Sequence, residues 1–237
     1  MLKKKEWDTD FFGKKMGVFL LDNFTEAELN KDLKEAENNK YDYIVCQLES
    51  PKAETIRLLE SKGFYLSDVG VIWLINVDEY LSMFEREEAK SVAVVTKASI
   101  ESLKNLQGVI RPMFPNSRFY SDPFFSQDEA DNLHMEWMKN SIMGKVADVV
   151  LQIPGKGFVT CKKKENRIGE IILIGVVEEF RGRNLGKSLM DASVTWFSDY
   201  FVKSIRVKTQ LKNVDAMNFY RKLGFSIKNY DMTRSEE

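Results

Sequence analysis

Residues 171–225 read IILIGVVEEFRGRNLGKSLMDASVTWFSDYFVKSIRVKTQLKNVDAMNFYRKLGF, and this stretch decides the fold. The apolar, β-branched run from Ile171 to Val177 predicts a strand. The turn RGRNLGK, from Arg181 to Lys187, comes next and leads directly into an amphipathic helix. This order is typical of an anion site, because the first N–H groups of a helix have no partner within it and the helix dipole favours negative charge there.

Two common phosphate motifs do not match the turn. A P-loop requires GxxxxGK[ST], but Gly182 and Gly186 are only four positions apart, although Gly186-Lys187-Ser188 copies the end of that motif. A dinucleotide fingerprint requires GxGxxG, and the stretch contains no GxG. A different kind of phosphate site is therefore expected.

The elements after the turn follow from hydrophobic periodicity. Apolar residues at spacings of three and four predict a helix over 185–201, and alternation predicts a strand over 204–211. A second helix is expected over 214–223, ended by Gly224, with a closing strand over 225–230. Earlier in the chain, residues 128–141 have the pattern of a helix that carries His134.

The turn resembles the acyl-CoA site of the GNAT acetyltransferases, whose signature is [QR]xxGx[GA]. Arg181 stands at its first position, Gly186 at its last, and Asn184 where the family usually has glycine. Asparagine enters left-handed backbone conformations more readily than other non-glycine residues. The segment KNVDAMNFYRKLGF resembles the family's second signature, on Asn213, Ala216, Phe219, Tyr220, Gly224 and Phe225.

The resemblance implies a mixed α/β sheet of the GNAT fold. It predicts a smaller, degenerate GNAT-like α/β domain over residues 1–88 and a GNAT acyltransferase domain over 89–237. The first part indeed contains a faint copy of the second: the segment from Tyr43 parallels that from Ile205, with a strand, a helix ending at Gly63, and a strand near 71–77. Both duplication and the general likeness of strand–helix–strand units explain this parallel. No RGxxG turn precedes the first copy, so we expect one CoA per chain.

Between the two parts, residues 85–90 (EREEAK) are the expected linker or an exposed helix. A strand over 92–96 and a helix over 99–107 are expected to follow.

The family's chemistry implies a role for each part of the stretch. Backbone N–H groups of residues 183–188 would hold the CoA pyrophosphate. The end of the strand, with Gly175 allowing close approach or a bulge, would pair with pantetheine, and an N–H near Val176–Val177 would stabilise the oxyanion. The predicted residues for acetyl-CoA or another short acyl-CoA are Ile174, Val176, Val177, Arg181, Gly182, Arg183, Asn184, Leu185, Gly186, Lys187, Ser188 and Asn213.

Proton transfer is assigned in part. Tyr220 occupies the position where GNAT enzymes have a tyrosine near the thioester sulfur, so it is the expected general acid for the leaving thiolate. The alternative is that its hydroxyl only positions the sulfur. Glu170, Asp148, Asp122 and a chain of water molecules are all candidates for the base. His134 is either a structural histidine, which is the simpler interpretation, or a catalytic one.

Short segments outside the CoA stretch resemble the acyltransferases of nucleotide-linked amino sugars, the TDP-fucosamine acetyltransferase (WecD-like) subfamily. They are EWDTDFFGKKMG from Glu6, RFYSDPFF from Arg118, EWMKNSIMGKVADVVL from Glu136 and TQLKNVDAMNFY from Thr209. This resemblance implies a dTDP-linked 3- or 4-amino-6-deoxyhexose as acceptor, in O-antigen or capsule precursor synthesis, and allows a homodimer. The residues expected near the sugar are Arg118, Tyr120, Asp122 and Gln210.

Composition excludes several other classes. The 237 residues carry a formal net charge of −1, which gives no electrostatic basis for general nucleic-acid binding. No apolar run is long enough to span a membrane, and no apolar segment follows Lys3–Lys5 as in a secretory signal. Cys46 and Cys161 lie far apart and suggest reduced thiols of a cytoplasmic protein, and one histidine makes a metal site unexpected.

Two rival functions remain open. A GNAT enzyme could acylate a protein N-terminus, a lysine or another small-molecule amine, such as an aminoglycoside. The chain could also be a CoA-binding module without catalysis, although Asn213 and Tyr220 are both present.

Overall fold

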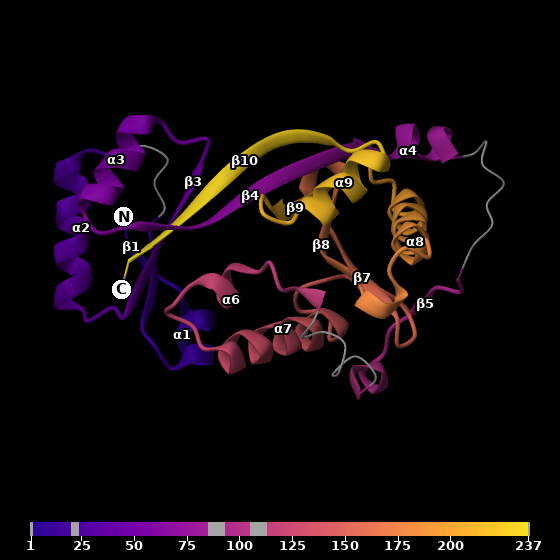
Figure 1. The fold of residues 1–237 in the computed structure, drawn as a ribbon, viewed down its shortest axis with the longest axis horizontal. Coiled ribbons are helices and arrows are strands. Elements are labelled where there is room, and N and C mark those ends of the chain that lie inside the picture. Colours follow the sequence, from indigo (N-terminus) through magenta and orange to yellow (C-terminus); the bar gives the residue numbers. More distant parts are fainter. Residues whose placement is uncertain (1, 20–23, 85–92, 105–112, 237) are drawn as a thin grey trace.

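The computed structural model describes residues 2–19, 24–84, 93–104 and 113–236. One ten-stranded sheet runs through the molecule in the order β1-β2-β3-β10-β4-β9-β8-β7-β6-β5 (Figure 1). Its strands are β1 (Leu2–Lys4), β2 (Met16–Phe19), β3 (Tyr43–Glu49), β4 (Tyr65–Asn76), β5 (Thr96–Lys97), β6 (Val149–Ile153), β7 (Gly157–Lys163), β8 (Ile168–Val176), β9 (Ser204–Gln210) and β10 (Ser226–Glu236). The α-helices are α1 (Glu6–Phe12), α2 (Glu26–Asn38), α3 (Ala53–Ser61), α4 (Val77–Phe84), α6 (Arg118–Ser121), α7 (Gln127–Ile142), α8 (Leu185–Asp199) and α9 (Val214–Lys222).

Helices α8 and α7 cover opposite faces of strands β6 to β8. Val149 and Val159 belong to the core cluster under α8, whereas their chain neighbours Val150 and Phe158 belong to the cluster under α7. Successive side chains of a strand point to opposite faces, so the two helices cannot share one face. The packing on the α8 side is close, since a Cβ atom at Gly169 would lie 2.6 Å from the Phe197 ring.

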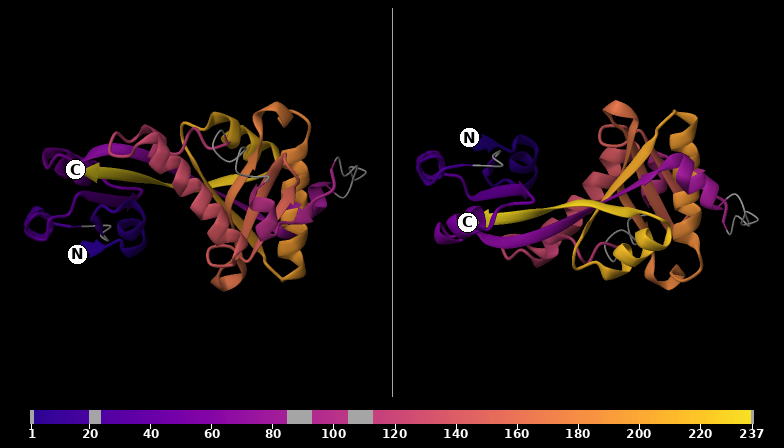
Figure 2. Two further views of the ribbon diagram at one scale, coloured as in Figure 1. Left: turned by 90° about the horizontal axis from the view of Figure 1, so that it is seen from below. Right: turned by 90° about the horizontal axis from the view of Figure 1, so that it is seen from above.

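Strands β4 and β10 join the two ends of the molecule. They run side by side as the long ribbon in Figures 1 and 2, and β10 pairs antiparallel with both β3 and β4. Strand β4 in turn pairs antiparallel with β9. Strand β4, the last of the N-terminal part, therefore lies beside β9 of the C-terminal part. Strand β10, the last of the C-terminal part, lies beside β3 of the N-terminal part, which gives the order β3-β10-β4-β9. The division at residues 88 and 89 stays a prediction, and this exchange makes the two parts one sheet.

The strand–helix–strand unit predicted near the N-terminus is present. Helices α3 and α9 both end with a glycine in the left-handed region, Gly63 at φ 90° and Gly224 at φ 85°. In both, the residue after the glycine donates back to the third-last helical residue: Phe64 N–H to the Leu59 carbonyl at 3.1 Å, and Phe225 N–H to the Tyr220 carbonyl at 3.0 Å. This is the Schellman arrangement, so the two units share their helix ending as well as their order.

Several boundaries differ from the sequence prediction. Strand β4 begins at Tyr65 rather than near Val71, and β10 continues to Glu236 rather than ending near Tyr230. Strand β5 contains only Thr96 and Lys97, and the expected helix from Ser99 begins as a 3-10 turn over Ile100–Ser102. The expected linker over 85–90, the start of the expected strand at Val92 and the expected helix beyond 104 lie outside the described residues.

The two left-handed glycines give a stability prediction. Replacing Gly63 or Gly224 by alanine should lower the free energy of unfolding by about 1 kcal/mol, because φ near 90° is strained for any residue with a Cβ atom. In a chain of this size that corresponds to a fall in Tm of about 2–4 °C, measurable by calorimetry. Gly175→Ala is the control, since its φ is not positive and the nearest atom a Cβ would meet is the Met113 sulfur at 3.3 Å. Unchanged melting of both variants would contradict this explanation of the helix ends.

Candidate functional site

Strands β8 and β9 separate in the middle of the sheet. Their parallel pairing begins at Ile168 and Ser204 and stops at Ile171 and Val207. Beyond that point β8 remains paired with β7, and β9 remains paired with β4. The register of β7 and β8 shifts between Leu173 and Ile171, so Ile172 is a bulge residue at the start of the separation. The sequence analysis expected this strand end to be open for pairing with pantetheine, but placed the bulge option at Gly175.

The bulged strand leaves polar backbone groups facing the gap. The Val177 N–H donates to the Lys156 carbonyl at 2.8 Å, so residue 177 faces β7. Because hydrogen-bonded and non-bonded pairs alternate in an antiparallel ladder, Ile174 and Val176 direct their backbone groups away from β7 and into the gap. The Val176 carbonyl already accepts a bond of 3.1 Å from Arg181 Nε. The expected oxyanion donor near Val176–Val177 therefore cannot be Val177, whose N–H is occupied.

The turn before α8 has the backbone geometry that an anion site requires. Asn184 is the N-cap and is left-handed (φ 57°, ψ 12°), and Gly182 has φ 73°. The first helical bond comes from the Ser188 N–H to the Asn184 carbonyl at 3.0 Å. Within the described chain, the N–H groups of residues 183–186 make no backbone bond outside the helix, and the N-cap side chain closes none of them. Ser188 drops out of the predicted cradle of residues 183–188, because its N–H is already bonded.

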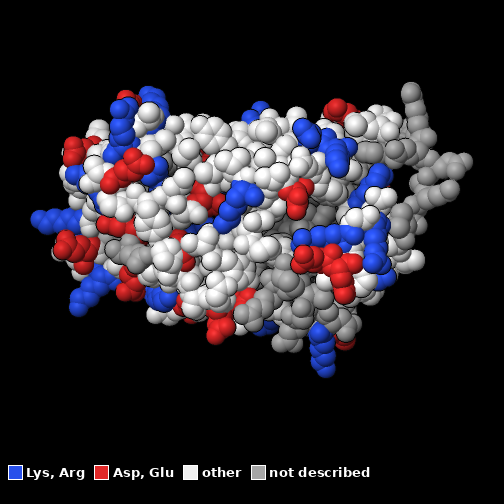
Figure 3. Space-filling view, viewed as in Figure 1, with Lys and Arg blue, Asp and Glu red and all other residues white. Residues whose placement is uncertain are grey.

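Positive side chains flank this turn, but they differ in how firmly neighbouring groups hold them. Arg181 is tied to the strand by its bond to Val176, and Lys187 forms an ion pair of 3.1 Å with Asp191. Arg183 is exposed and lies over the Phe180 ring at 5.6 Å. Figure 3 shows Lys and Arg side chains over the region where α8 lies in Figure 1, with acidic side chains beside them. Leu185 is buried in the core, and a Cβ atom at Gly186 would press on Phe219 at 3.2 Å.

The N-terminal copy has no comparable anion site. Helix α2 follows β2, which pairs parallel with β3. Helix α8 follows β8, which pairs parallel with β9. In α2, however, the Thr25 hydroxyl accepts from the Glu28 N–H at 3.3 Å and the Glu28 carboxylate accepts from the Thr25 N–H at 2.8 Å. This capping box uses the donors that α8 leaves open, and Glu26 adds a second negative charge in the first turn. Of these two corresponding helix starts, α8 is therefore the one whose first N–H groups are left open for an anion.

Helix α9 holds the predicted acid next to the separated strands. Asn213 caps the helix, its side-chain oxygen accepting from the Ala216 N–H at 3.2 Å. Tyr220 is 3% exposed and packs against Trp73, Phe219 and Phe225. Its hydroxyl has no hydrogen-bond partner among the described residues, and burial raises the pKa of the phenol. Tyr220 therefore keeps its proton at neutral pH and has it available for a ligand.

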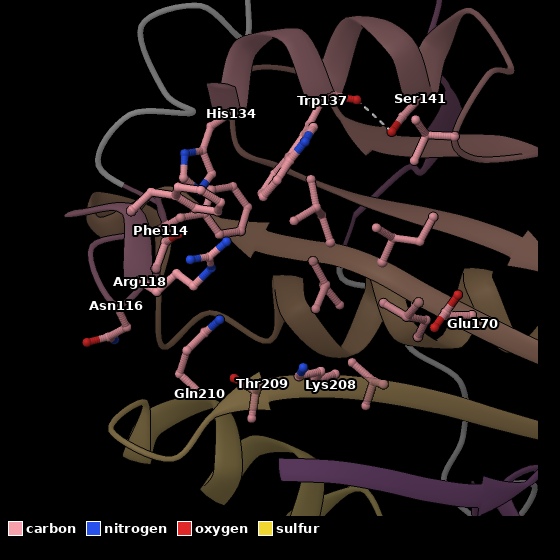
Figure 4. A pocket seen from close by; sticks show the side chains of 18 of the residues that line it. Phe114, Asn116, Arg118, His134, Trp137, Ser141, Glu170, Lys208, Thr209 and Gln210 are labelled. Carbon is pink, nitrogen blue, oxygen red and sulfur yellow. Dashed lines mark hydrogen bonds between the residues drawn. The ribbon is translucent and has the colours of Figure 1, made fainter. Parts of the chain in front are cut away.

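Tyr220 is one of the residues that line a groove of about 890 Å³. It is lined by the facing ends of β8 and β9, by α7, by the segment around α6 and by residues of the N-terminal part. Figure 4 shows Phe114, Arg118 and His134 across the gap from Thr209 and Gln210. The N-terminal part contributes Trp7, Gln47 and Asp68, and β10 contributes Thr233. Sequence reasoning missed these four, because they reach the groove only through the exchange of β4 and β10.

The predicted acceptor residues separate into two groups. Arg118 and Gln210 line the groove, whereas Tyr120 and Asp122 lie outside its lining. Asp122 is 3% exposed and accepts hydrogen bonds from the hydroxyls of Tyr43 and Tyr65, the latter at 2.8 Å. Tyr120 donates to Asp131 at 2.8 Å. Asp122 thus supports the aromatic cluster beneath Arg118, whose Nη1 donates to the Tyr43 hydroxyl at 3.2 Å.

The candidate bases are also distributed unevenly. Asp148 accepts the Lys163 N–H at 2.7 Å and is exposed outside the groove. Glu170 lines the groove and forms an ion pair with Lys164 at 3.0 Å. Asp68, which the sequence analysis did not select, lines the groove as well, and burial raises the pKa of its carboxyl against the opposing effect of Lys208. A charged residue inside the strand YLSDVGVIWLIN was the one signal that could have marked it.

His134 lies in the groove with a defined protonation geometry. Its ring is stacked between those of Phe114 and Tyr120, at centroid distances of 5.4 and 5.3 Å, and Trp137 meets it edge-on. Nδ1 lies 2.6 Å from the Ala130 carbonyl oxygen. Burial lowers the pKa of the imidazole below its usual 6.5, against the opposing effects of that carbonyl and of Asp131.

No three His, Cys, Asp or Glu side chains gather as a metal site anywhere in the described ranges. No helix among the described residues is long and apolar enough to cross a membrane. The CoA signature residues, by contrast, converge on the separated strands, with the turn before α8 at one end and Tyr220 beside the gap.

The sequence comparisons identify the same region. Residues 150–225 match the acetyltransferase (GNAT) family. Over 118 residues the chain is 26% identical to the spore coat polysaccharide biosynthesis protein SpsD of Bacillus subtilis (strain 168), and this match covers 49% of the chain and 41% of that protein. The matched region thus spans less than half the length of this relative.

Solved structures extend the likeness over the whole fold. A functionally unknown conserved protein from Staphylococcus epidermidis ATCC 12228 aligns with a TM-score of 0.65 at 16% identity, covering 94% of this chain and 84% of that one. A tandem GNAT protein from the clavulanic acid biosynthesis pathway aligns with a TM-score of 0.62 at 11% identity, covering 95% and 76%. Identities this low show the fold alone. The structural likeness confirms the predicted mixed α/β sheet of the GNAT type.

Proposed function

We propose that this chain, whose residues 150–225 match the acetyltransferase (GNAT) family, is a CoA-dependent acyltransferase that acylates the amine of a dTDP-linked amino-6-deoxyhexose. The donor is acetyl-CoA or a short hydroxyacyl-CoA, and the amine attacks the thioester directly. The observation that carries the proposal is the continuous groove, which joins the site beside Tyr220 to a wide acceptor end built by both parts of the chain.

The donor end matches the needs of acyl-CoA. The open N–H groups of residues 183–186 suit the pyrophosphate, and Arg181, Arg183 and Lys187 add positive charge. The gap-facing backbone of Ile174 and Val176 suits the two amides of pantetheine, which would extend β8 as a further strand does. Asn213 lines the groove with its amide nitrogen free of the capping bond, so it can add a side-chain donor there.

The charges of the acceptor end favour an anionic partner. Lys164 and Lys208 are paired with Glu170 and Asp231, at 3.0 and 2.7 Å. Arg118, Lys145 and Lys162 line the same groove without an ion pair to any described residue. The sugar diphosphate of a nucleotide sugar supplies the negative charge for such cations, and the guanidinium of Arg118 can hold two phosphate oxygens at once. The likeness to a protein named for polysaccharide biosynthesis supports an acceptor of the sugar class.

The proposal is tested by thiol release. Purified protein is given acetyl-CoA or hydroxybutyryl-CoA with dTDP-linked 3- and 4-amino-6-deoxyhexoses, an aminoglycoside, a lysine and a peptide with a free N-terminus. Turnover should be at least tenfold more efficient on one of the nucleotide sugars. Preferential turnover of the peptide, the lysine or the aminoglycoside would replace the acceptor class, and acetyl-CoA binding without any turnover would favour a non-catalytic CoA module.

Arg118 provides a sharper test of the acceptor end. Arg118→Ala should raise the KM for the dTDP-amino sugar about tenfold or more, because charge-assisted hydrogen bonds contribute about 1.5–3 kcal/mol each. The KM for acetyl-CoA should stay unchanged. Lys14→Ala is the matched control: it removes a cation from the same aromatic cluster, 4.5 Å from the Phe124 ring centre, at a position outside the groove. Equal KM values in the Arg118 variant and the wild type would contradict the phosphate assignment.

A further inference from the structure

We propose that His134 is the general base of this acyltransferase and that its Nε2 atom accepts the proton of the attacking amine. This inference rests on the proposed acyl transfer and assigns the proton acceptor that the sequence left open. It depends on three features of the described structure: the tautomer of the ring, its rigid placement, and its position beside the separated strands.

The hydrogen bond at Nδ1 decides the tautomer. A backbone carbonyl oxygen can only accept, so at 2.6 Å from the Ala130 oxygen Nδ1 must carry the proton. In the neutral ring Nε2 is then an unprotonated acceptor. Nε2 has no hydrogen-bond partner among the described residues, and His134 is part of the groove lining. A histidine that served only packing would have no need of this open acceptor.

The ring is held rigidly and close to the reacting groups. Phe114 and Tyr120 lie almost parallel to it, at interplanar angles of 12° and 14°, and fix its plane. The Phe114 ring of this stack also contacts β8, because it lies 3.5 Å from where a Cβ atom of Gly175 would be. His134 is therefore one ring away from the separated strand that carries Ile174. An acceptor amine attacking a thioester at this strand comes within reach of Nε2 directly or through one water.

The surroundings favour the neutral, basic form at physiological pH. Burial lowers the pKa of the imidazole, so most of it is neutral at pH 7. The titratable groups that act on the ring or stack on it are Asp131 on its own helix and Tyr120 from α6, and the charged residues Arg118 and Asp68 line the same groove. Asp131 acts in the opposite direction to burial, but it is engaged by the Tyr120 hydroxyl at 2.8 Å. Among the rival carboxylates, Glu170 is ion-paired and Asp68 is held near Lys208 and Arg118.

Two side chains account for both proton transfers of the reaction. The amine nitrogen forms a bond to the acyl carbon and gives its proton to His134 Nε2. The carbon–sulfur bond breaks, and the departing thiolate takes the proton of the Tyr220 hydroxyl. The imidazolium then releases its proton to solvent and the phenolate takes one up, which restores both groups for the next cycle. No oxidant, metal or further co-reactant is needed.

The tautomer can be tested in the unmodified protein, because the chain contains one histidine. With ¹⁵N-labelled imidazole, long-range ¹H–¹⁵N correlation spectra should show the proton on Nδ1 at pH 7 and a single titration below pH 6.5. The same midpoint should appear in kcat/KM for acetyl-CoA and a dTDP-amino sugar, with activity falling as pH decreases through it, because a protonated imidazole cannot accept. A proton on Nε2, or a kinetic midpoint that differs from the spectroscopic one, would overturn the proposal.

Substitution gives an independent readout. His134→Asn keeps an N–H donor for the Ala130 carbonyl but has no ring acceptor, so kcat should fall about 10²-fold and the acid limb should disappear. The Kd for acetyl-CoA should stay unchanged, which also reports that the variant is folded. In His134→Ala, added imidazole should restore turnover in proportion to its neutral form.

The outcomes separate this inference from the proposed function. Turnover retained within threefold in both variants, or loss of the acid limb in Asp68→Asn instead, would remove His134 as the base and leave the acyltransferase standing. No turnover by the wild type with any amine would remove the proposed function, and the base role would fall with it.

Discussion

Replacing Tyr220 by phenylalanine should lower kcat by about 10²–10³-fold with either acyl-CoA donor. The leaving thiolate then has no proton donor, because the hydroxyl of this groove-lining residue is gone and its ring is otherwise surrounded by Trp73, Phe219 and Phe225. The stability should not fall, since the hydroxyl has no hydrogen-bond partner among the described residues and its removal leaves no group unpaired. Steady-state kinetics and thermal melting measure the two effects on one preparation.

The split between kcat and KM distinguishes two roles for the hydroxyl. A proton donor acts in the transition state, so its loss lowers kcat and leaves the KM for acetyl-CoA nearly unchanged. A hydroxyl that only positions the sulfur contributes to ground-state binding, so its loss would raise KM and change kcat by less than about tenfold. The second result would retain the groove and remove the acid.

Tyr80→Phe is the matched control. Tyr80 is 2% exposed, does not line the groove, and donates to Asp191 Oδ1 at 2.6 Å. Losing this bond should cost about 1 kcal/mol of stability and leave kcat within twofold. The two tyrosine variants should thus show opposite patterns, one losing activity without stability and the other losing stability without activity.

The local elements of the fold could be predicted because each carries its own signal. The period of the apolar residues predicted α8, β9 and α9, and Gly224 marked the end of α9, where φ is 85°. The length of β4 could not be predicted, since Ser67 and Asp68 interrupt its apolar pattern. They lie within the strand because β10 runs alongside: Thr233 pairs with Asp68 and Arg234 with Leu66, and Ser67 lies at the register shift between these two pairs. Strand exchange is a property of the whole chain, and no single window of sequence encodes it.

The candidate site also has a part that could be predicted from the sequence and a part that could not. The turn before α8 is contiguous in the sequence, so its residues alone were enough to predict an anion site and a left-handed Asn184. The acceptor end combines residues as distant as Trp7 and Gln210, and its composition depends on which strands are neighbours. The role of His134 was open in the sequence because it depends on where Nδ1 points. Only the backbone carbonyl at Ala130 and the stacked rings settle that orientation.

Asn184→Asp should weaken acetyl-CoA binding by about 10- to 100-fold while leaving α8 as stable as before. Two unit charges 4 Å apart interact by about 4 kcal/mol at the effective dielectric of a protein surface, and solvent at this exposed turn reduces that to about 1.5–3 kcal/mol. The new carboxylate stands at the N-cap, beside the open N–H groups of residues 183–186, where the pyrophosphate is proposed to bind. Isothermal titration with acetyl-CoA measures the loss.

The opposite sign of the stability effect makes this prediction specific. Aspartate is as good an N-cap as asparagine and its charge favours the helix dipole, so α8 should keep its stability or gain up to about 0.5 kcal/mol. Asn166→Asp is the control, because Asn166 is also exposed and left-handed, at φ 57°, but lies before β8 at the end of the strand away from the turn. It adds the same charge in the same backbone conformation and should leave the Kd unchanged. Equal weakening in both variants would mean that overall charge governs CoA binding, and unchanged binding in Asn184→Asp would move the pyrophosphate away from this helix start.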